Sequence, residues 1–189
     1  DRPGKPGERM TRPPDGGPDL KQYGNMKTVV KFGGSSLADA AQFKKVAEII
    51  HADESRVYVI PSAPGKRFSG DTKVTDLLYH MYEEAKEKKD FSKTLQTIKD
   101  RYDQIIKGLG LKNFSLDREF DVIEHELLDD PDADYTASRG EYLNGRIMAR
   151  YLKYEFIDAQ EVIFFYEDGS LNLEKTTFTL RRRLEKVPR

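Results

Sequence analysis

A glycine-containing turn between an apolar strand and an amphipathic helix is the feature that most constrains the fold of this chain. Residues 28–30 are β-branched, and two of them are valines, as in a buried parallel strand. Beyond the turn, apolar residues recur at helical spacing at Phe43, Val46, Ala47 and Ile50. The segment Lys31-Phe32-Gly33-Gly34-Ser35-Ser36 therefore joins a predicted strand to a predicted helix.

This turn is a candidate anion site. Gly33 and Gly34 have no Cβ atom, so a polyanion can approach the backbone, and a helix N-terminus offers unpaired N–H groups. Lys31 adds a full positive charge. The spacing matches neither the dinucleotide-binding glycine pattern nor the P-loop pattern. Taken alone, the turn is equally compatible with a purely structural connection.

Composition excludes several classes of function. The 189 residues include 32 Lys and Arg against 33 Asp and Glu, a balance that argues against nucleic-acid or anionic-membrane binding. The chain has no cysteine, which excludes disulfides, thiolate metal sites and a cysteine nucleophile. No apolar run approaches the ~20 residues that cross a bilayer. We expect a soluble, cytoplasmic protein.

Two regions differ in composition. Residues 1–25 alternate proline and glycine with few apolar residues, so we expect a disordered leader or extension. Residues 26–189 form the expected folded unit, and Met26 is its natural start. In that unit strand and helix patterns alternate, which favours an α/β fold with a mostly parallel sheet.

The remaining patterns predict the other elements. A second strand is expected at 56–60, followed by a long loop over 62–74, and Thr75 is the expected N-cap of the next helix. Further helices are expected at 91–108, from 115, from about 134 and over 174–186, and strands at 156–159 and 162–165, the latter central in the sheet. The acidic turn 129–134 lacks the order of a calcium loop, so we expect a solvated turn.

Three separated segments resemble the aspartokinases of the amino acid kinase family. They are Lys31 to Ser36, Ser62-Ala63 with Thr75-Asp76-Leu77-Leu78, and Ser138-Arg139-Gly140-Glu141-Tyr142-Leu143-Asn144-Gly145. The resemblance implies a three-layer, mostly parallel sheet with helices on both faces, incomplete at the C-terminus and carrying a helical insertion. It further implies that residues 26–189 are the N-terminal, acceptor-binding part of the kinase domain.

The resemblance also implies an activity and its residues. The family transfers the γ-phosphoryl group of ATP to the side-chain carboxylate of L-aspartate, giving 4-phospho-L-aspartate, the first step of the pathway to lysine, threonine and methionine. Lys31 is then the catalytic residue, and Lys31, Phe32, Gly33, Gly34 and Ser35 bind the phosphates of ATP. Glu141 holds the α-ammonium group of aspartate, and Ser62 and Thr75 line its pocket. Mg²⁺ is expected with ATP, held by phosphate and water, with no protein ligand.

Alternatives stay open at this point. The same fold serves kinases with another carboxylate acceptor, and the chain could instead be a noncatalytic fragment that binds an amino acid or a partner chain. Apolar sheet surface would favour a homo-oligomer. Lys66 and Arg67 belong either to a phosphate site or to a mobile basic loop. The three histidines, His51, His80 and His125, have no partners at ligand spacing and receive no role.

Overall fold

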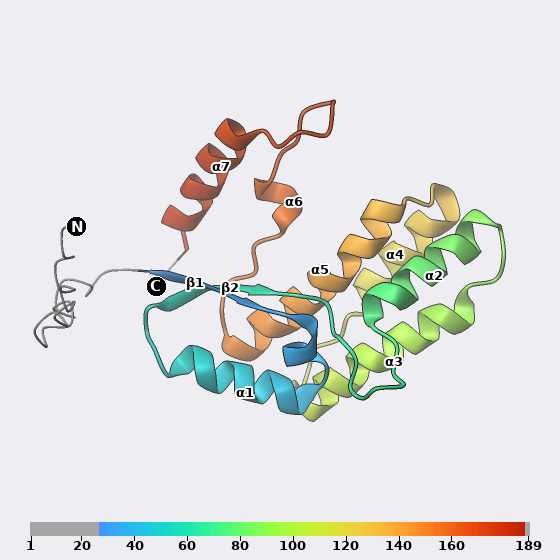
Figure 1. Cartoon of the computed structure of the whole chain (residues 1–189), viewed down its shortest axis with the longest axis horizontal. Helices are drawn as coiled ribbons and strands as arrows, with labels where there is room; N and C mark the ends of the chain where they lie inside the picture. Colours follow the sequence, from blue (N-terminus) through green and yellow to red (C-terminus); the bar gives the residue numbers. More distant parts are fainter. Residues whose placement is uncertain (1–26, 188–189) are drawn as a thin grey trace, which may run out of the picture.

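The computed structural model describes residues 27–187 (Figure 1). Along the chain, the elements are β1 (Thr28–Phe32), the 3₁₀ turn η2 (Gly34–Leu37), α1 (Ala40–His51), β2 (Arg56–Pro61), α2 (Val74–Lys86), α3 (Ser92–Gly108), α4 (Asp117–Asp129), α5 (Ala133–Leu152), α6 (Ala159–Val162) and α7 (Leu173–Glu185). The expected disorder of residues 1–25 concerns a segment outside the described residues and stays a prediction, as does the division of the chain at Met26.

Strands β1 and β2 pair in parallel, with Lys31 opposite Ile60 and Phe32 opposite Pro61. Both strands therefore end at the same edge of the sheet, and the turns that follow them meet there. The side chains alternate between faces, as the period of two in a strand requires. Val30, Phe32 and Val59 pack against the core, whereas Val29 and Ile60 on the other face are 63% and 50% exposed.

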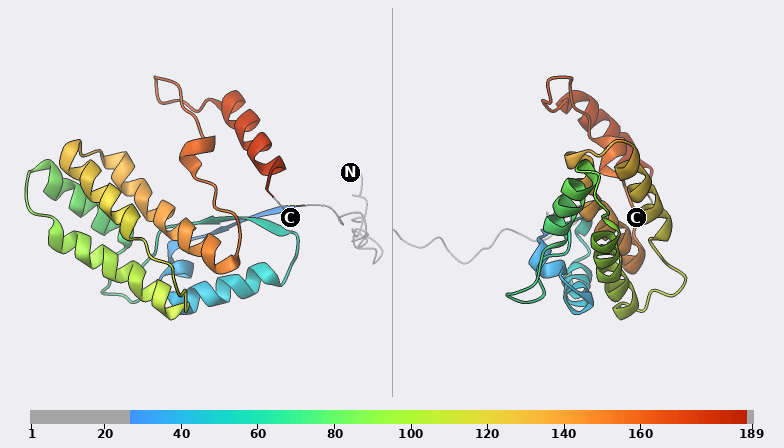
Figure 2. Two further views of the ribbon diagram at one scale, coloured as in Figure 1. Left: turned by 180° about the vertical axis from the view of Figure 1, so that it is seen from behind. Right: turned by 90° about the vertical axis from the view of Figure 1, so that its right-hand side faces the viewer.

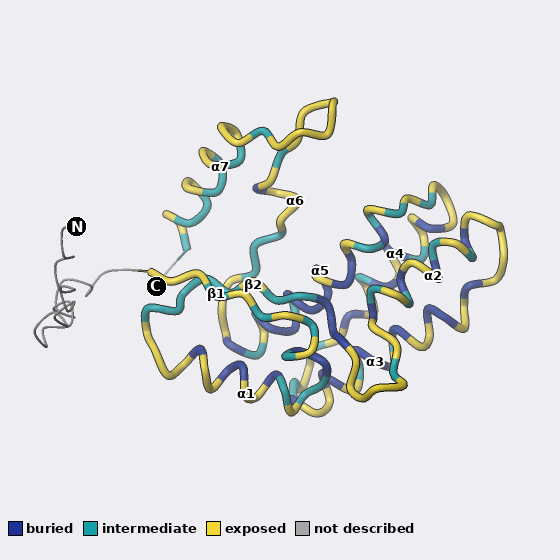
Figure 3. Tube along the Cα trace, in the orientation of Figure 1, coloured by how far each residue is buried: buried dark blue, intermediate teal, exposed yellow. Residues whose placement is uncertain are grey.

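The core lies between the sheet and five helices. Helices α1 and α5 contact β2, and α2, α3, α4 and α5 pack against one another, forming the bundle seen beside the strands in Figures 1 and 2. Each helix contributes one apolar face, so buried and exposed segments alternate along the trace (Figure 3). The largest fully buried side chains include Tyr102, Phe43, Leu37, Leu78 and Met81.

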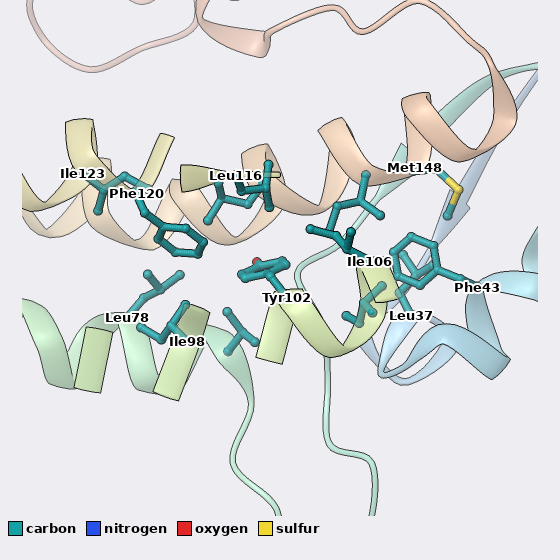
Figure 4. Packing of buried hydrophobic residues seen from close by; sticks show 14 of the residues in the cluster. Leu37, Phe43, Leu78, Ile98, Tyr102, Ile106, Leu116, Phe120, Ile123 and Met148 are labelled. Atoms are coloured by element: carbon teal, nitrogen blue, oxygen red, sulfur yellow. The ribbon is translucent and has the colours of Figure 1, made fainter. Parts of the chain in front are cut away.

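Tyr102 illustrates how a polar atom is accommodated in this core. Its ring packs near Phe120 at a centroid distance of 6.1 Å (Figure 4), and its hydroxyl donates to the Gly140 carbonyl at 2.8 Å. Burial raises the pKa of the Tyr102 hydroxyl well above its ordinary value. Tyr102 therefore links α3 to α5 as a neutral hydrogen-bond donor.

The C-terminal part departs from the sequence prediction. Residues 156–158 form no strand, Ala159–Val162 form the short helix α6, and Phe165 makes only an isolated antiparallel bridge to Leu171. The predicted strands at 156–159 and 162–165 are therefore wrong for the described residues. A strand needs a neighbouring strand along its length, and here the chain turns back after Phe165 with only this bridge. Helices α6 and α7 lie together, away from the helix bundle (Figures 1 and 2).

The other expected elements are confirmed within one to three residues, except for one cap. Helix α2 begins at Val74 after Lys73, which provides no side-chain cap, so the prediction that Thr75 is the N-cap is wrong. Asp132 in the acidic turn caps α5 by accepting from the Tyr135 amide at 2.6 Å.

The fold is α/β with parallel strands, as the sequence predicts. Within residues 27–187, none of the helices has the length and apolarity needed to cross a membrane.

Candidate active site

A hollow of about 400 Å³ lies where the ends of β1 and β2 meet helices α2 and α5. Its lining is Gly34, Ser35, Ser62, Ala63, Pro64, Gly65, Lys66, Lys73, Thr75 and Glu141. Five of the predicted site residues, Gly34, Ser35, Ser62, Thr75 and Glu141, are therefore brought together. Lys31 reaches the same place through Ser62, and Phe32 and Gly33 lie beside it without lining it.

The turns after the two strands cross at Gly34 and Gly65. The Gly65 amide donates to the Gly34 carbonyl at 2.8 Å, and a Cβ on Gly34 would lie 2.8 Å from the Ala63 carbonyl oxygen. A Cβ on Gly65 would lie 2.6 Å from the Gly34 carbonyl carbon, whereas a Cβ on Gly33 would meet nothing within 4 Å. Glycine at position 34 is thus required by the crossing of two backbones, a packing reason that the sequence did not indicate.

The amides of the turn do not belong to a long helix. Gly34–Leu37 form a 3₁₀ turn, and α1 begins only at Ala40, where Asp39 caps it by accepting from the Gln42 amide at 2.9 Å. The segment joins β1 to the amphipathic helix α1 as predicted, but the 3₁₀ turn separates the two glycines from the N-terminus of α1. Among the backbone hydrogen bonds of residues 27–187, none uses the Gly33 or Gly34 amide as donor, so both N–H groups can still donate to an anion.

Lys31 projects from the solvent-exposed face of β1 next to the hollow. Its Nζ donates to the Ser62 hydroxyl at 3.3 Å. The positive charge of Lys31 therefore lies at the end of β2, beside the hollow. Phe32, the next residue, points the other way and packs against the core. Its carbonyl accepts from the Ser62 amide at 3.0 Å, so its observed role is to hold Ser62 in place.

Glu141 is brought to the hollow by the close approach of α5 to the turn after β2. A Cβ on Gly140 would lie 2.8 Å from the Ala63 Cβ, so only glycine lets the helix come this near. The neighbouring Glu141 Oε1 then accepts from the Ala63 amide at 3.2 Å. Glu141 remains exposed at the rim, so the carboxylate can still accept from a ligand.

Sequence reasoning missed Asn144 and Lys73. Asn144 is completely buried, and its Nδ2 donates to the Ser62 carbonyl at 2.7 Å. Lys73 lines the hollow together with Lys66. A polar residue on the apolar face of a predicted helix, three positions after Glu141, was the signal available for Asn144. Nothing in the local pattern distinguished Lys73 from an ordinary solvated lysine.

Arg67 does not extend freely from a mobile loop. Its guanidinium pairs with Asp71 at 2.8 Å, and the same carboxylate pairs with the buried Arg101 at 2.8 Å. Lys66, by contrast, has no such carboxylate partner among the residues described and lines the hollow. Lys66 and Arg67, which the sequence pattern could not distinguish, thus have different environments.

Other polar candidates lie outside the hollow. Arg139 is 8% exposed and stacks between the Tyr135 and Tyr142 rings at 4.4 and 4.7 Å from their centroids. His80 lies 3.5 Å from Glu84 on α2. In the part of the chain that is described, no three His, Asp or Glu side chains gather closely enough to hold a metal ion.

Comparison with known proteins shows the family to which this chain belongs. The amino acid kinase family matches residues 26–187, and the chain belongs to that family. Its similarity is to the aspartate kinases within it. Aspartokinase 3 of Bacillus subtilis (strain 168) is 35% identical over 139 residues, covering 71% of this chain and 31% of the relative.

Solved structures agree with this. The aspartate kinase of Clostridium acetobutylicum, described as an allosteric enzyme, superposes with a TM-score of 0.81 and 42% identity over 86% of this chain and 37% of that one. Aspartokinase III of E. coli, solved with aspartate and ADP, gives a TM-score of 0.67 at 21% identity, covering 85% and 39%, and supports the fold alone. The chain therefore spans between 31% and 39% of the length of these relatives.

Proposed function

We propose that this chain carries the acceptor and phosphoryl-transfer side of an ATP-dependent aspartate kinase. The observation that carries the proposal is the grouping of Lys31, Ser62 and Glu141 around one hollow, with Lys31 Nζ 3.3 Å from Ser62 Oγ and Glu141 Oε1 3.2 Å from the Ala63 amide. The first group is positive and the last is negative, as a reaction between a polyphosphate and an amino acid requires.

The reaction needs positioning and charge neutralisation more than acid–base chemistry. An oxygen of the aspartate side chain forms a bond to the γ-phosphorus of ATP, and the bond from that phosphorus to the ADP oxygen breaks. The attacking carboxylate is already ionised at neutral pH, because its ordinary pKa is about 3.9, so no general base is needed. We assign Lys31 and the Gly33 and Gly34 amides to the transferring phosphoryl oxygens.

Glu141 is assigned to the α-ammonium group of the acceptor. A carboxylate fixed at one end by the Ala63 amide at the rim of the hollow attracts a cation more strongly than a carboxylate in bulk water. Ser62 and Thr75 supply hydroxyls near the same place and are assigned to the aspartate carboxylates. Succinate lacks the ammonium group and should bind without using Glu141.

The described residues provide no cluster of three acidic or histidine side chains for a resident ion. Any Mg²⁺ is therefore proposed to arrive with ATP, bound to phosphate oxygens and water. The pathway assignment, the first step towards lysine, threonine and methionine, and the cytoplasmic location stay predictions.

The test is formation of an acyl phosphate, trapped with hydroxylamine as the hydroxamate, in the presence of ATP, Mg²⁺ and aspartate. Lys31→Met should abolish hydroxamate formation and leave aspartate binding within about twofold of the unmodified chain, because a transition-state contact lowers kcat. Lys27→Met is the matched control, since Lys27 Nζ donates to Tyr58 Oη at the same 3.3 Å at the other end of the same strands.

Each outcome separates the candidates. The kinase is supported if hydroxamate formation depends on aspartate, is lost in Lys31→Met and is kept in Lys27→Met. Equal loss in both lysine variants contradicts the role of Lys31. Aspartate binding with no hydroxamate identifies a noncatalytic binding fragment, and hydroxamate formed only with glutamate or its derivatives identifies a kinase of the same fold with another acceptor.

A further inference from the structure

A buried ion cluster lies behind the hollow and takes no part in the proposed reaction. The Arg101 side chain is 4% exposed and its Nη1 lies 2.8 Å from Asp71 Oδ2, whose side chain is 9% exposed. Arg101 Nη2 donates to the Ala38 carbonyl at 3.3 Å and also to the Gly65 carbonyl. One side chain of α3 therefore contacts the segment after η2, the turn after β2 and the far end of the loop.

Arg67 completes the cluster from the outside. Its Nε and Nη2 lie 2.8 and 2.9 Å from the two Asp71 carboxylate oxygens, and its amide donates to Asp71 Oδ2 at 2.9 Å. The Arg67 hydrogen bonds and the Arg101 charge hold the pKa of Asp71 well below its ordinary value, so the carboxylate stays ionised. We call Arg67, Asp71 and Arg101 the Asp71 clamp.

We propose that the Asp71 clamp positions the loop of residues 62–73 against the turn after β1 and so sets the strength with which the hollow binds a polyphosphate anion. This inference rests on the proposed function and goes beyond it by assigning positioning residues. Arg101 does not line the hollow. It acts through Gly65, whose backbone crosses Gly34, and through Asp71, which fixes the loop between Lys66 and Lys73.

The clamp also determines which cations face the ligand. Four basic side chains surround this loop, and Asp71 pairs with two of them, Arg67 and Arg101. The two that remain, Lys66 and Lys73, line the hollow. Loss of the Asp71 charge would remove the ion pair of Arg67, which would keep its hydrogen bond to Gln104 at 3.1 Å. It would also leave Arg101 as a buried cation without its counter-ion, so the loop would have to move to rehydrate it.

The test is the affinity of the full chain for inorganic tripolyphosphate, measured by titration calorimetry. Asp71→Asn keeps the size of the side chain and removes its charge, and we expect binding to weaken about fivefold or more. Arg101→Lys keeps a charge with one nitrogen instead of a fork and should weaken binding less than Arg101→Met. Amide shifts of Gly34 and Gly65 should move in Asp71→Asn even without ligand.

Arg146→Met is the matched control. It breaks another partly buried ion pair, Arg146–Glu119 at 2.7 Å between α5 and α4, and neither residue lines the hollow. It should lower stability and leave tripolyphosphate binding within about twofold, because this ion pair joins α5 to α4 and not to the loop of residues 62–73. Equal effects of Asp71→Asn and Arg146→Met on binding would reduce the clamp to a stability element and overturn the inference.

Three further outcomes are decisive. If Asp71→Asn does not fold, Arg67→Met removes only the more exposed partner and should weaken binding by a smaller factor; unchanged binding in that variant overturns the inference. Failure of the unmodified chain to bind tripolyphosphate overturns it as well. Weakened tripolyphosphate binding in Asp71→Asn would support the clamp even if the unmodified chain forms no hydroxamate from aspartate. The absence of hydroxamate would reject the kinase alone, so the two proposals fail separately.

Discussion

Substitution of the two adjacent glycines by alanine offers a sharp test of the site architecture, because the same change meets different surroundings. In Gly34→Ala the new Cβ would lie 2.8 Å from the Ala63 carbonyl oxygen and 3.1 and 3.2 Å from backbone atoms of Gly65, where ordinary contacts begin at 3.4 Å. These neighbours are backbone atoms on a hydrogen-bonded turn, so no side-chain rotation relieves the overlap.

The magnitude follows from two contributions. Overpacking of this kind costs about 1–3 kcal/mol, and weakening the Gly65-to-Gly34 hydrogen bond adds about 1 kcal/mol, so Gly34→Ala should destabilise the fold by about 2–4 kcal/mol. Gly33→Ala meets nothing within 4 Å and has φ −74° and ψ 166°, which alanine adopts freely. Gly33→Ala should be neutral or stabilising by up to about 1 kcal/mol.

Urea unfolding followed by circular dichroism measures both variants. With a urea m-value of about 2 kcal/mol/M, the Gly34→Ala midpoint should fall by about 1–2 M relative to the unmodified chain, and the Gly33→Ala midpoint should not fall. Equal midpoints for the two variants would refute the crossing of the two turns as the reason for glycine at position 34.

Three further predictions address the acceptor, the clamp and the core. Glu141→Gln should weaken aspartate binding about tenfold and leave succinate binding unchanged in calorimetry; equal weakening of both ligands would contradict the ammonium assignment. Because the folded pKa of Asp71 is lowered, its stabilising contribution is present above its unfolded pKa of about 3.9 and is lost as pH falls through the lower folded pKa. Urea unfolding at pH 6 and pH 3 should therefore show a smaller acid loss of stability in Asp71→Asn than in the unmodified chain, and an equal loss would count against the ion pairing. Tyr102→Phe removes the 2.8 Å bond to the Gly140 carbonyl and should cost about 1–2 kcal/mol in the same assay; an unchanged midpoint would show that the bond contributes nothing.

Local patterns predicted the long helices, each of which completes its own hydrogen bonds, and missed the short helix α6. Helices α3, α4, α5 and α7 begin close to their expected starts, because helical hydrogen bonds lie within the segment and the apolar periodicity decides the buried face. Strand β2 was predicted because an apolar run of this length suits a buried parallel strand. The failure at 162–165 has the opposite cause, since an apolar run forms a strand only where another strand pairs with it.

The contacts of the candidate site could likewise be predicted only in part. Motif residues at the ends of β1 and β2 converge because parallel strands share an edge, so Gly34 and Ser62 could be predicted to lie near each other. Glu141 lies on α5, and only the resemblance to the aspartokinases placed it in the same site. The crossing of Gly34 with Gly65 and the pairing of Arg101 with Asp71 join residues about 30 positions apart. Such contacts depend on how the helices pack, which single-sequence periodicity does not specify.

The most direct test of the central claim is an amide chemical-shift titration of the ¹⁵N-labelled chain with aspartate. If the hollow is the acceptor site, the largest changes should fall on Ala63, whose amide donates to Glu141, and on the neighbouring turns at 33–35 and 62–65. In Glu141→Gln the same changes should require about tenfold more aspartate. Changes confined to α7, or none in these turns at a concentration that saturates binding, would contradict the assignment of this hollow to aspartate.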